Sequence, residues 1–251
     1  MRLRTAAALL AFVVAGFGAA PAGAVSFTLE VLQNGVSQGD FNETELGCSS
    51  SGGPSETCYY AGSGPGDGVY AGDLSLDAWN LFVDEDPVVT GTVAVTNVAL
   101  TTQQFTLIFT LLVVPPIAPS SVMGGSIQGG VTDNNGDGAT LQTVVGSAFY
   151  EALIDGSGVQ TLFDHNQTVT AGAFLSASTG TADFGTPIPS DPGPQVLTSI
   201  GIQLDFLLSP GDSASFTSNF VVEAVPEPAT LALLGIGIAG LWLQGRPRRS
   251  V

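Results

Sequence analysis

Residues 200–222 read IGIQLDFLLSPGDSASFTSNFVV, and this stretch decides the fold class. In its first half every second residue is apolar: Ile200, Ile202, Leu204, Phe206 and Leu208. Apolar residues return after the turn, at positions 214, 216, 220 and 222. Alternation with a period of two places such side chains on one face of a strand. The Ser-Pro-Gly-Asp segment at 209–212 supplies turn residues, so the stretch predicts a β-hairpin with one buried face.

The same alternation recurs nearer the N-terminus, over residues 27–31, 89–96 and 105–113. The last two runs predict a second hairpin. Its second strand is apolar on both faces and is therefore expected at the centre of a sheet. Regions 47–73 and 180–196 are rich in Gly, Pro and Ser, and this composition predicts loops.

The chain as a whole has the composition of an all-β protein. It is 44% hydrophobic and only 11% charged, and its 33 glycines favour many turns. No segment between residues 25 and 224 shows a sustained helical period with caps. Several short strands separated by turns predict an all-β fold, a β-sandwich or jelly-roll-like domain. Residues 204–222 also resemble the last strands of bacterial Ig-like surface modules, which implies the same architecture.

The charges are distributed unevenly along the chain. All five basic residues lie at its two ends: Arg2, Arg4, Arg246, Arg248 and Arg249. Of the 22 acidic residues only Glu227 lies outside residues 25–225, so that span carries 21 carboxylates, one His and no Lys or Arg. Its self-repulsion must be tolerated, screened or relieved by bound cations. Nucleic-acid binding is excluded, because no side chain there can neutralise phosphates.

The N-terminus has the layout of a signal peptide. Arg2 and Arg4 form a positive region, and residues 5–20 are apolar and uncharged. Ala22-Gly23-Ala24 is a small-residue cleavage site of the A-x-A kind. We expect export by the Sec machinery and cleavage by signal peptidase after Ala24; the alternative is a retained transmembrane anchor.

The C-terminus contains three elements in order: Pro226-Glu227-Pro228, the uncharged stretch 229–243, and the cluster Arg246, Arg248 and Arg249. A helix of 15 residues spans about 22 Å. Because a bilayer's hydrocarbon core is about 30 Å thick, this stretch predicts a marginal transmembrane helix. The positive-inside rule places the arginine cluster in the cytoplasm.

These three elements together resemble the PEP-CTERM sorting domain, and the resemblance covers residues 225–251. It implies that Pro226, Glu227 and Pro228 are recognised by an exosortase, a membrane-embedded Cys-dependent protease or transpeptidase. It also implies a Gram-negative bacterium that makes exopolysaccharide. The expected organisation is a signal peptide (1–24), an acidic β-sandwich domain (25–224) and the sorting domain (225–251). The protein would be anchored in the inner membrane by its C-terminal helix and, after processing, reach the cell surface or extracellular matrix.

Cys48 and Cys58 flank a Gly/Ser-rich segment. In an oxidising compartment this spacing predicts a disulfide that closes a short surface loop. A metal site would need more ligands than two cysteines and one distant histidine supply.

Residues 133–138 read DNNGDG and form the best internal candidate for a site. Asp133, Asn135 and Asp137 match the oxygen-ligand positions in the first half of a calcium loop, and Gly138 stands at its turn position. Position 12 of that loop would be Val144 in place of the coordinating Glu. The alternative is a plain hairpin turn, which Asn, Asp and Gly favour by themselves. Calcium is therefore the one cofactor that the sequence suggests.

Two motifs match catalytic patterns without the necessary surroundings. The segment 35–39, GVSQG, fits G-x-S-x-G, but a nucleophile elbow needs a following helix and a downstream Asp and His. Gly211-Asp212-Ser213 falls in the expected tight turn. We therefore expect no catalytic residues and no enzymatic activity. An exported hydrolase built on Ser37 and His165 is the least favoured alternative.

The sequence thus predicts an exported, surface-anchored or matrix-associated protein, sorted through its tail. The specific activity of its β domain is left open. A calcium-dependent module that binds carbohydrate or exopolysaccharide is the alternative, resting on the Asp133 segment and on the acidic charge.

Overall fold

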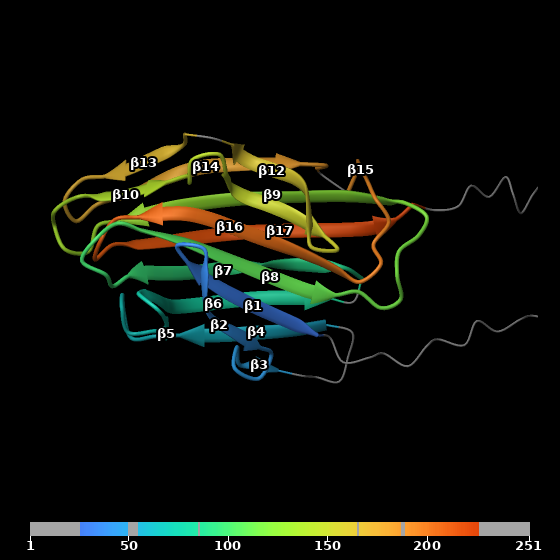
Figure 1. Cartoon of the computed structure of the whole chain (residues 1–251), viewed down its shortest axis with the longest axis horizontal. Helices are drawn as coiled ribbons and strands as arrows, with labels where there is room; N and C mark the ends of the chain where they lie inside the picture. Colours follow the sequence, from blue (N-terminus) through green and yellow to red (C-terminus); the bar gives the residue numbers. More distant parts are fainter. Residues whose placement is uncertain (1–25, 50–54, 85, 165, 187–188, 226–251) are drawn as a thin grey trace, which may run out of the picture.

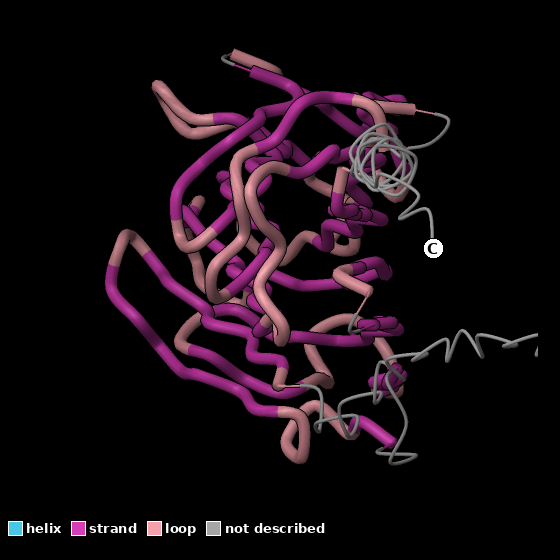
Figure 2. The backbone as a smooth tube through the Cα atoms, turned by 90° about the vertical axis from the view of Figure 1, so that its right-hand side faces the viewer, coloured by secondary structure: helices cyan, strands magenta, loops and turns pink. Residues whose placement is uncertain are grey.

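The structure is a computed structural model, and it describes residues 26–49, 55–84, 86–164, 166–186 and 189–225. The signal segment and the sorting segment after Val225 lie outside these residues, and so do the two helices expected to flank the domain. Across the ranges just given, no helix has the length and hydropathy needed to cross a membrane. These residues form strands and turns, coloured magenta and pink in Figure 2.

The described residues build two antiparallel sheets that pack as a sandwich, so the all-β prediction is confirmed (Figure 1). The first, sheet A, has the strand order β12-β11-β16-β8-β1-β2, with β10 beside β16 and β13 beside β10. Its strands are β1 (Phe27–Gln33), β2 (Val36–Asn42), β8 (Gln103–Leu112), β10 (Ala139–Gln142), β11 (Ala148–Ile154), β12 (Ser157–Asp164), β13 (Thr168–Ala171) and β16 (Ser199–Leu208).

The second, sheet B, has the order β14-β9-β17-β7-β6-β4-β3, with β15 beside β9 and β5 beside β6. Its strands are β3 (Cys48–Ser49), β4 (Ser55–Ala61), β5 (Val69–Ala71), β6 (Leu74–Asp84), β7 (Val88–Asn97), β9 (Ser121–Thr132), β14 (Ser176–Phe184), β15 (Asp191–Gly193) and β17 (Ser213–Ala224).

Both hairpins expected from the sequence are wrong in their pairing, although the strands themselves exist. β7 lies in sheet B, whereas β8 lies in sheet A between β1 and β16. β16 likewise pairs with β8 and β11, whereas β17 pairs with β7 and β9. The two turns therefore cross from one sheet to the other. Asn97 joins them, because its side-chain amide donates to the carbonyls of Thr101 (3.0 Å) and Leu208 (2.8 Å).

The expectation that 47–73 is a loop is also wrong, since it contains β3, β4 and β5. β4 runs antiparallel along the edge of β6 from Ser55 to Ala61. Its alternation is concealed in the sequence because Glu56 takes one of the buried positions. Region 180–196 similarly contains the end of β14 and the short β15.

The interior holds the side chains that the alternation identified. Ile200, Ile202, Leu204, Phe206 and Leu208 on β16 are each at most 1% exposed. They face the buried side of β17, and the ring centroids of Phe206 and Phe216 lie 4.9 Å apart across the interior. Burial of these two apolar faces supplies the main driving force for pairing the sheets.

Candidate functional site

Asp133 organises the turn between β9 and β10. One carboxylate oxygen, Oδ1, accepts hydrogen bonds from the backbone N–H of Asn135 (3.3 Å) and Gly136 (3.0 Å). The other, Oδ2, accepts one from the N–H of Phe174 at 2.6 Å. Gly136 and Gly138 adopt φ of 89° and 94°, values that favour glycine and let the chain wrap around a carboxylate. The local sequence therefore folds around this side chain.

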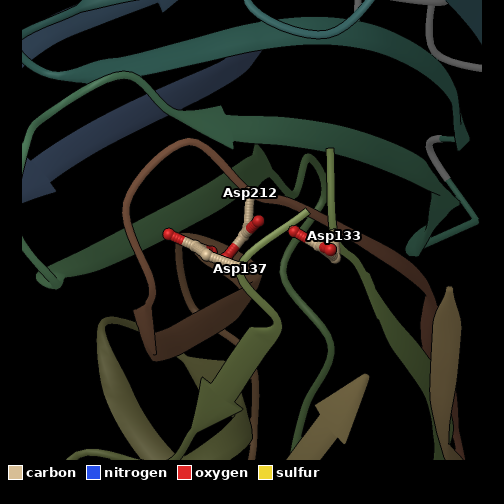
Figure 3. A group of neighbouring side chains, drawn as sticks. All are labelled: Asp133, Asp137 and Asp212. Atoms are coloured by element: carbon tan, nitrogen blue, oxygen red, sulfur yellow. The ribbon is translucent and has the colours of Figure 1, made fainter. Parts of the chain in front are cut away.

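Asp212 brings a second buried carboxylate to the same place from the turn between β16 and β17. The Asp133 side chain is 2% exposed, and that of Asp212 is fully buried. Asp212 accepts hydrogen bonds from the Ser209 hydroxyl and, at 3.4 Å, from the N–H of Asn134. Carboxylate oxygens of Asp133, Asp137 and Asp212 all lie within 4.8 Å of one another (Figure 3).

The two buried carboxyls have pKa values shifted in opposite directions. Burial favours the neutral form of Asp133 and by itself would raise the pKa of its carboxyl. Hydrogen bonds from backbone N–H groups outweigh this effect and lower that pKa; the donors are Phe174, Gly136, Gly138 and Asn135. Burial raises the pKa of Asp212, and the neighbouring Asp133 charge raises it further. A divalent cation between them would relieve this repulsion, since clustered carboxylates are typical calcium ligands.

Asp133 and Asp137, two of the three calcium ligands suggested by the sequence, belong to this group of carboxylates, and the third, Asn135, makes two side-chain hydrogen bonds beside it. The Asn135 amide donates to the Pro210 carbonyl at 3.1 Å, and its Oδ1 accepts from the Asp137 N–H at 3.0 Å. Asp212 was not foreseen, because it stands far along the chain in a segment that gave only a turn signal. We call Asp133, Asp137 and Asp212 the aspartate cluster.

Those of the other singled-out residues that the structure describes lie apart from this cluster. Cys48 and Cys58 face each other on β3 and β4 and are joined by a disulfide. Ser37 is exposed on the edge strand β2, which continues where a nucleophile elbow would turn into a helix. His165 and the terminal residues Ala22, Ala24, Pro226, Glu227, Pro228, Arg246, Arg248 and Arg249 lie outside the described residues.

Comparison with known families identifies the C-terminal segment. The family of the PEP-CTERM protein-sorting motif matches residues 224–249. No curated protein matches the chain. The resemblance stated for residues 225–251 is therefore confirmed: the chain carries a PEP-CTERM sorting signal, the kind of signal that an exosortase processes.

Proposed function

From the PEP-CTERM signal we propose that this chain is a non-enzymatic β-sandwich protein displayed on the cell surface or in the extracellular matrix of a Gram-negative bacterium. The Sec machinery exports it, signal peptidase removes residues 1–24, and an exosortase processes the tail. The match to residues 224–249 carries this proposal. The absence of Lys and Arg between residues 25 and 225 supports it, because every basic residue then belongs to a terminal signal.

The arrangement of the strands suits display from a membrane. β1 begins and β17 ends at the same end of the sandwich, on the right in Figure 1. A tail that leaves β17 and enters a membrane would hold this end near the bilayer. The turn with the aspartate cluster would then point away, because it lies at the start of β17.

Replacing Pro226, Glu227 and Pro228 by alanine is expected to block processing. The substituted chain should keep the residues after position 228 and stay with the inner membrane, whereas the original chain should lose them and appear outside. Intact-mass spectrometry of both cell fractions measures this. Glu223→Ala, an exposed change just ahead of the motif, is the control and should be processed normally. Intact residues after Pro228 in the mature original protein would contradict the proposal.

A calcium-dependent module that binds carbohydrate is the second candidate. The observation that favours it is the aspartate cluster, whose three carboxylates come from two turns that are far apart in the sequence. In a domain without Lys or Arg, a bound cation would compensate the charge that the surrounding hydrogen-bond donors leave unbalanced.

Calcium at millimolar concentration is expected to raise the midpoint of thermal unfolding. A ligand at a hundred times its Kd adds about 2.7 kcal/mol to the free energy of unfolding, which corresponds to a shift of several degrees. Asp137→Asn should remove the shift, because it replaces the exposed carboxylate of the cluster. Asp40→Asn, which changes an exposed carboxylate on β2, should leave it intact. An unchanged midpoint in the original protein would overturn the calcium candidate.

A further inference from the structure

The outer face of sheet B carries a straight row of exposed, uncharged polar side chains. The strand register sets Tyr59 opposite Asn80, Asn80 opposite Thr92, and Thr92 opposite Thr217. The row continues from Thr217 to Gln128 and from Gln128 to Thr181. It therefore crosses β4, β6, β7, β17, β9 and β14 at right angles to the strands. At about 4.8 Å between neighbouring strands, it is about 24 Å long.

A groove runs beside this row because, on the same outer face, the next residue of each strand is small. Its floor consists of Ala61, Ala78, Ala94, Ser215, Gly130 and Ser178, which are again opposite one another in register. Three adjoining hollows of about 140, 310 and 280 Å³ follow this floor. The first two share Ala78 and Ala94, and the last two share Ser215. We call this feature the outer groove.

The outer groove is nearly free of charge in a domain that has 21 carboxylates. Among the residues that line its three hollows, Asp77 is the only one with an acidic side chain. That carboxylate is buried and already accepts hydrogen bonds from Gly66, Ser75 and Thr96. A charged partner would therefore find no complementary charge here, and an anionic one would be repelled by the rest of the domain.

The wall of the groove offers free hydrogen-bonding groups and one aromatic ring. Among the described residues, the side chains of Asn80, Gln128 and Thr181 make no hydrogen bond. Thr92 and Thr217 share one at 2.9 Å, which leaves each hydroxyl further acceptor capacity. The Tyr59 side chain is 64% exposed although it stands on a strand and not on a loop. Such rings combine a broad apolar face with a polar end.

From these features we infer that the outer groove binds an extended chain of a neutral polysaccharide. A pyranose ring presents a face of C–H groups, which matches the Tyr59 ring, and a rim of hydroxyls, which matches the amide and hydroxyl row. Both partners are uncharged, so binding requires no compensating ion. The inference goes beyond the calcium-dependent candidate above, because it places carbohydrate binding in the outer groove and does not require calcium.

Affinity electrophoresis of the full chain in native gels, with detergent present, tests the inference. The gels contain a neutral polysaccharide (hydroxyethylcellulose, dextran, mannan or xyloglucan) or the anionic alginate. We expect retardation by at least one neutral polymer and none by alginate. Tyr59→Ala should weaken that association at least about tenfold, the loss typical of one aromatic anchor. Ser215→Trp should abolish it by filling the floor, whereas Tyr59→Phe should retain it.

Two controls distinguish binding in the groove from a general effect of losing an exposed aromatic ring and from calcium-dependent binding. Phe174→Ala removes a ring that is 71% exposed but lies outside the groove, and it should bind normally. Asp137→Asn should also bind normally with a calcium chelator present, so failure of the calcium candidate would not be mistaken for failure of the groove. Retardation by no neutral polymer, or equal retardation of the Tyr59→Ala chain, would overturn the inference. So would a dimer that Tyr59→Ala dissociates, because a second copy would then occupy the groove.

Discussion

Phe216→Ala is expected to cost the domain about 3–5 kcal/mol in free energy of unfolding, the usual loss for a fully buried phenylalanine. Phe216 is 1% exposed and stands at the middle of the interior. Its ring centroid lies 4.9 Å from that of Phe206 and 6.4 Å from that of Phe149, two residues of the opposite sheet. Removing the ring leaves a cavity between the sheets that rigid strands cannot close.

Urea denaturation followed by circular dichroism measures this effect. The midpoint should fall while the slope m stays the same, since the surface exposed on unfolding hardly changes. Phe82→Ala is the matched control: the same substitution on the outer face of β6, where the side chain is 38% exposed. It should cost less than about 1 kcal/mol. Equal losses for the two variants would contradict the assignment of Phe216 to the core.

Five strands, β1, β7, β8, β16 and β17, could be predicted from the sequence, but their pairing could not. Alternation over residues 200–208 identifies a strand and its buried face, because both depend on local periodicity. A turn such as 209–212 can join two strands of one sheet or cross from one sheet to the other. The alternation of apolar residues in the flanking strands is the same in both cases, so it does not distinguish them. The choice is made by contacts from elsewhere, here by Asn97, whose amide holds the corner at the Leu208 carbonyl. β4 was missed because its buried positions include a glutamate and a cysteine.

The candidate sites likewise consist of a part that a local sequence pattern suggests and a part that depends on the tertiary structure. The spacing of Asp133 and Asp137 within one turn is a local pattern, so the sequence could suggest it. Asp212 lies close to that turn only in the folded protein, and no local sequence pattern predicts that it does. The outer groove depends on the register of six strands, which places Tyr59 and Gln128 in one row. Such a row has no counterpart in the linear sequence.

Asp77→Ala is expected to lower the free energy of unfolding by about 3 kcal/mol, because it leaves several buried donors without their charged acceptor. Asp77 is 8% exposed and lies at the bulge of β6. Its Oδ1 accepts from the Gly66 N–H at 3.0 Å and from the Ser75 hydroxyl at 2.7 Å. Its Oδ2 accepts from the Thr96 hydroxyl at 2.5 Å. The carboxylate thereby fastens the segment before β5, and Gly62, Gly64 and Pro65 of that segment line the middle hollow of the outer groove.

Asp77→Asn is the matched variant, since its carbonyl oxygen can still accept from Gly66 and Ser75 while its amide can donate to the Thr96 hydroxyl. We expect a loss of about 1 kcal/mol for it, measured by urea denaturation beside Asp77→Ala. Hydrogen exchange at the Gly66 amide should speed up in Asp77→Ala and stay slow in Asp77→Asn. Equal losses would mean that the charge itself, and not the hydrogen bonds, stabilises this corner. Because Asp77→Asn also makes the groove lining fully neutral, it should retain polysaccharide binding, whereas the loosened wall of Asp77→Ala should weaken it.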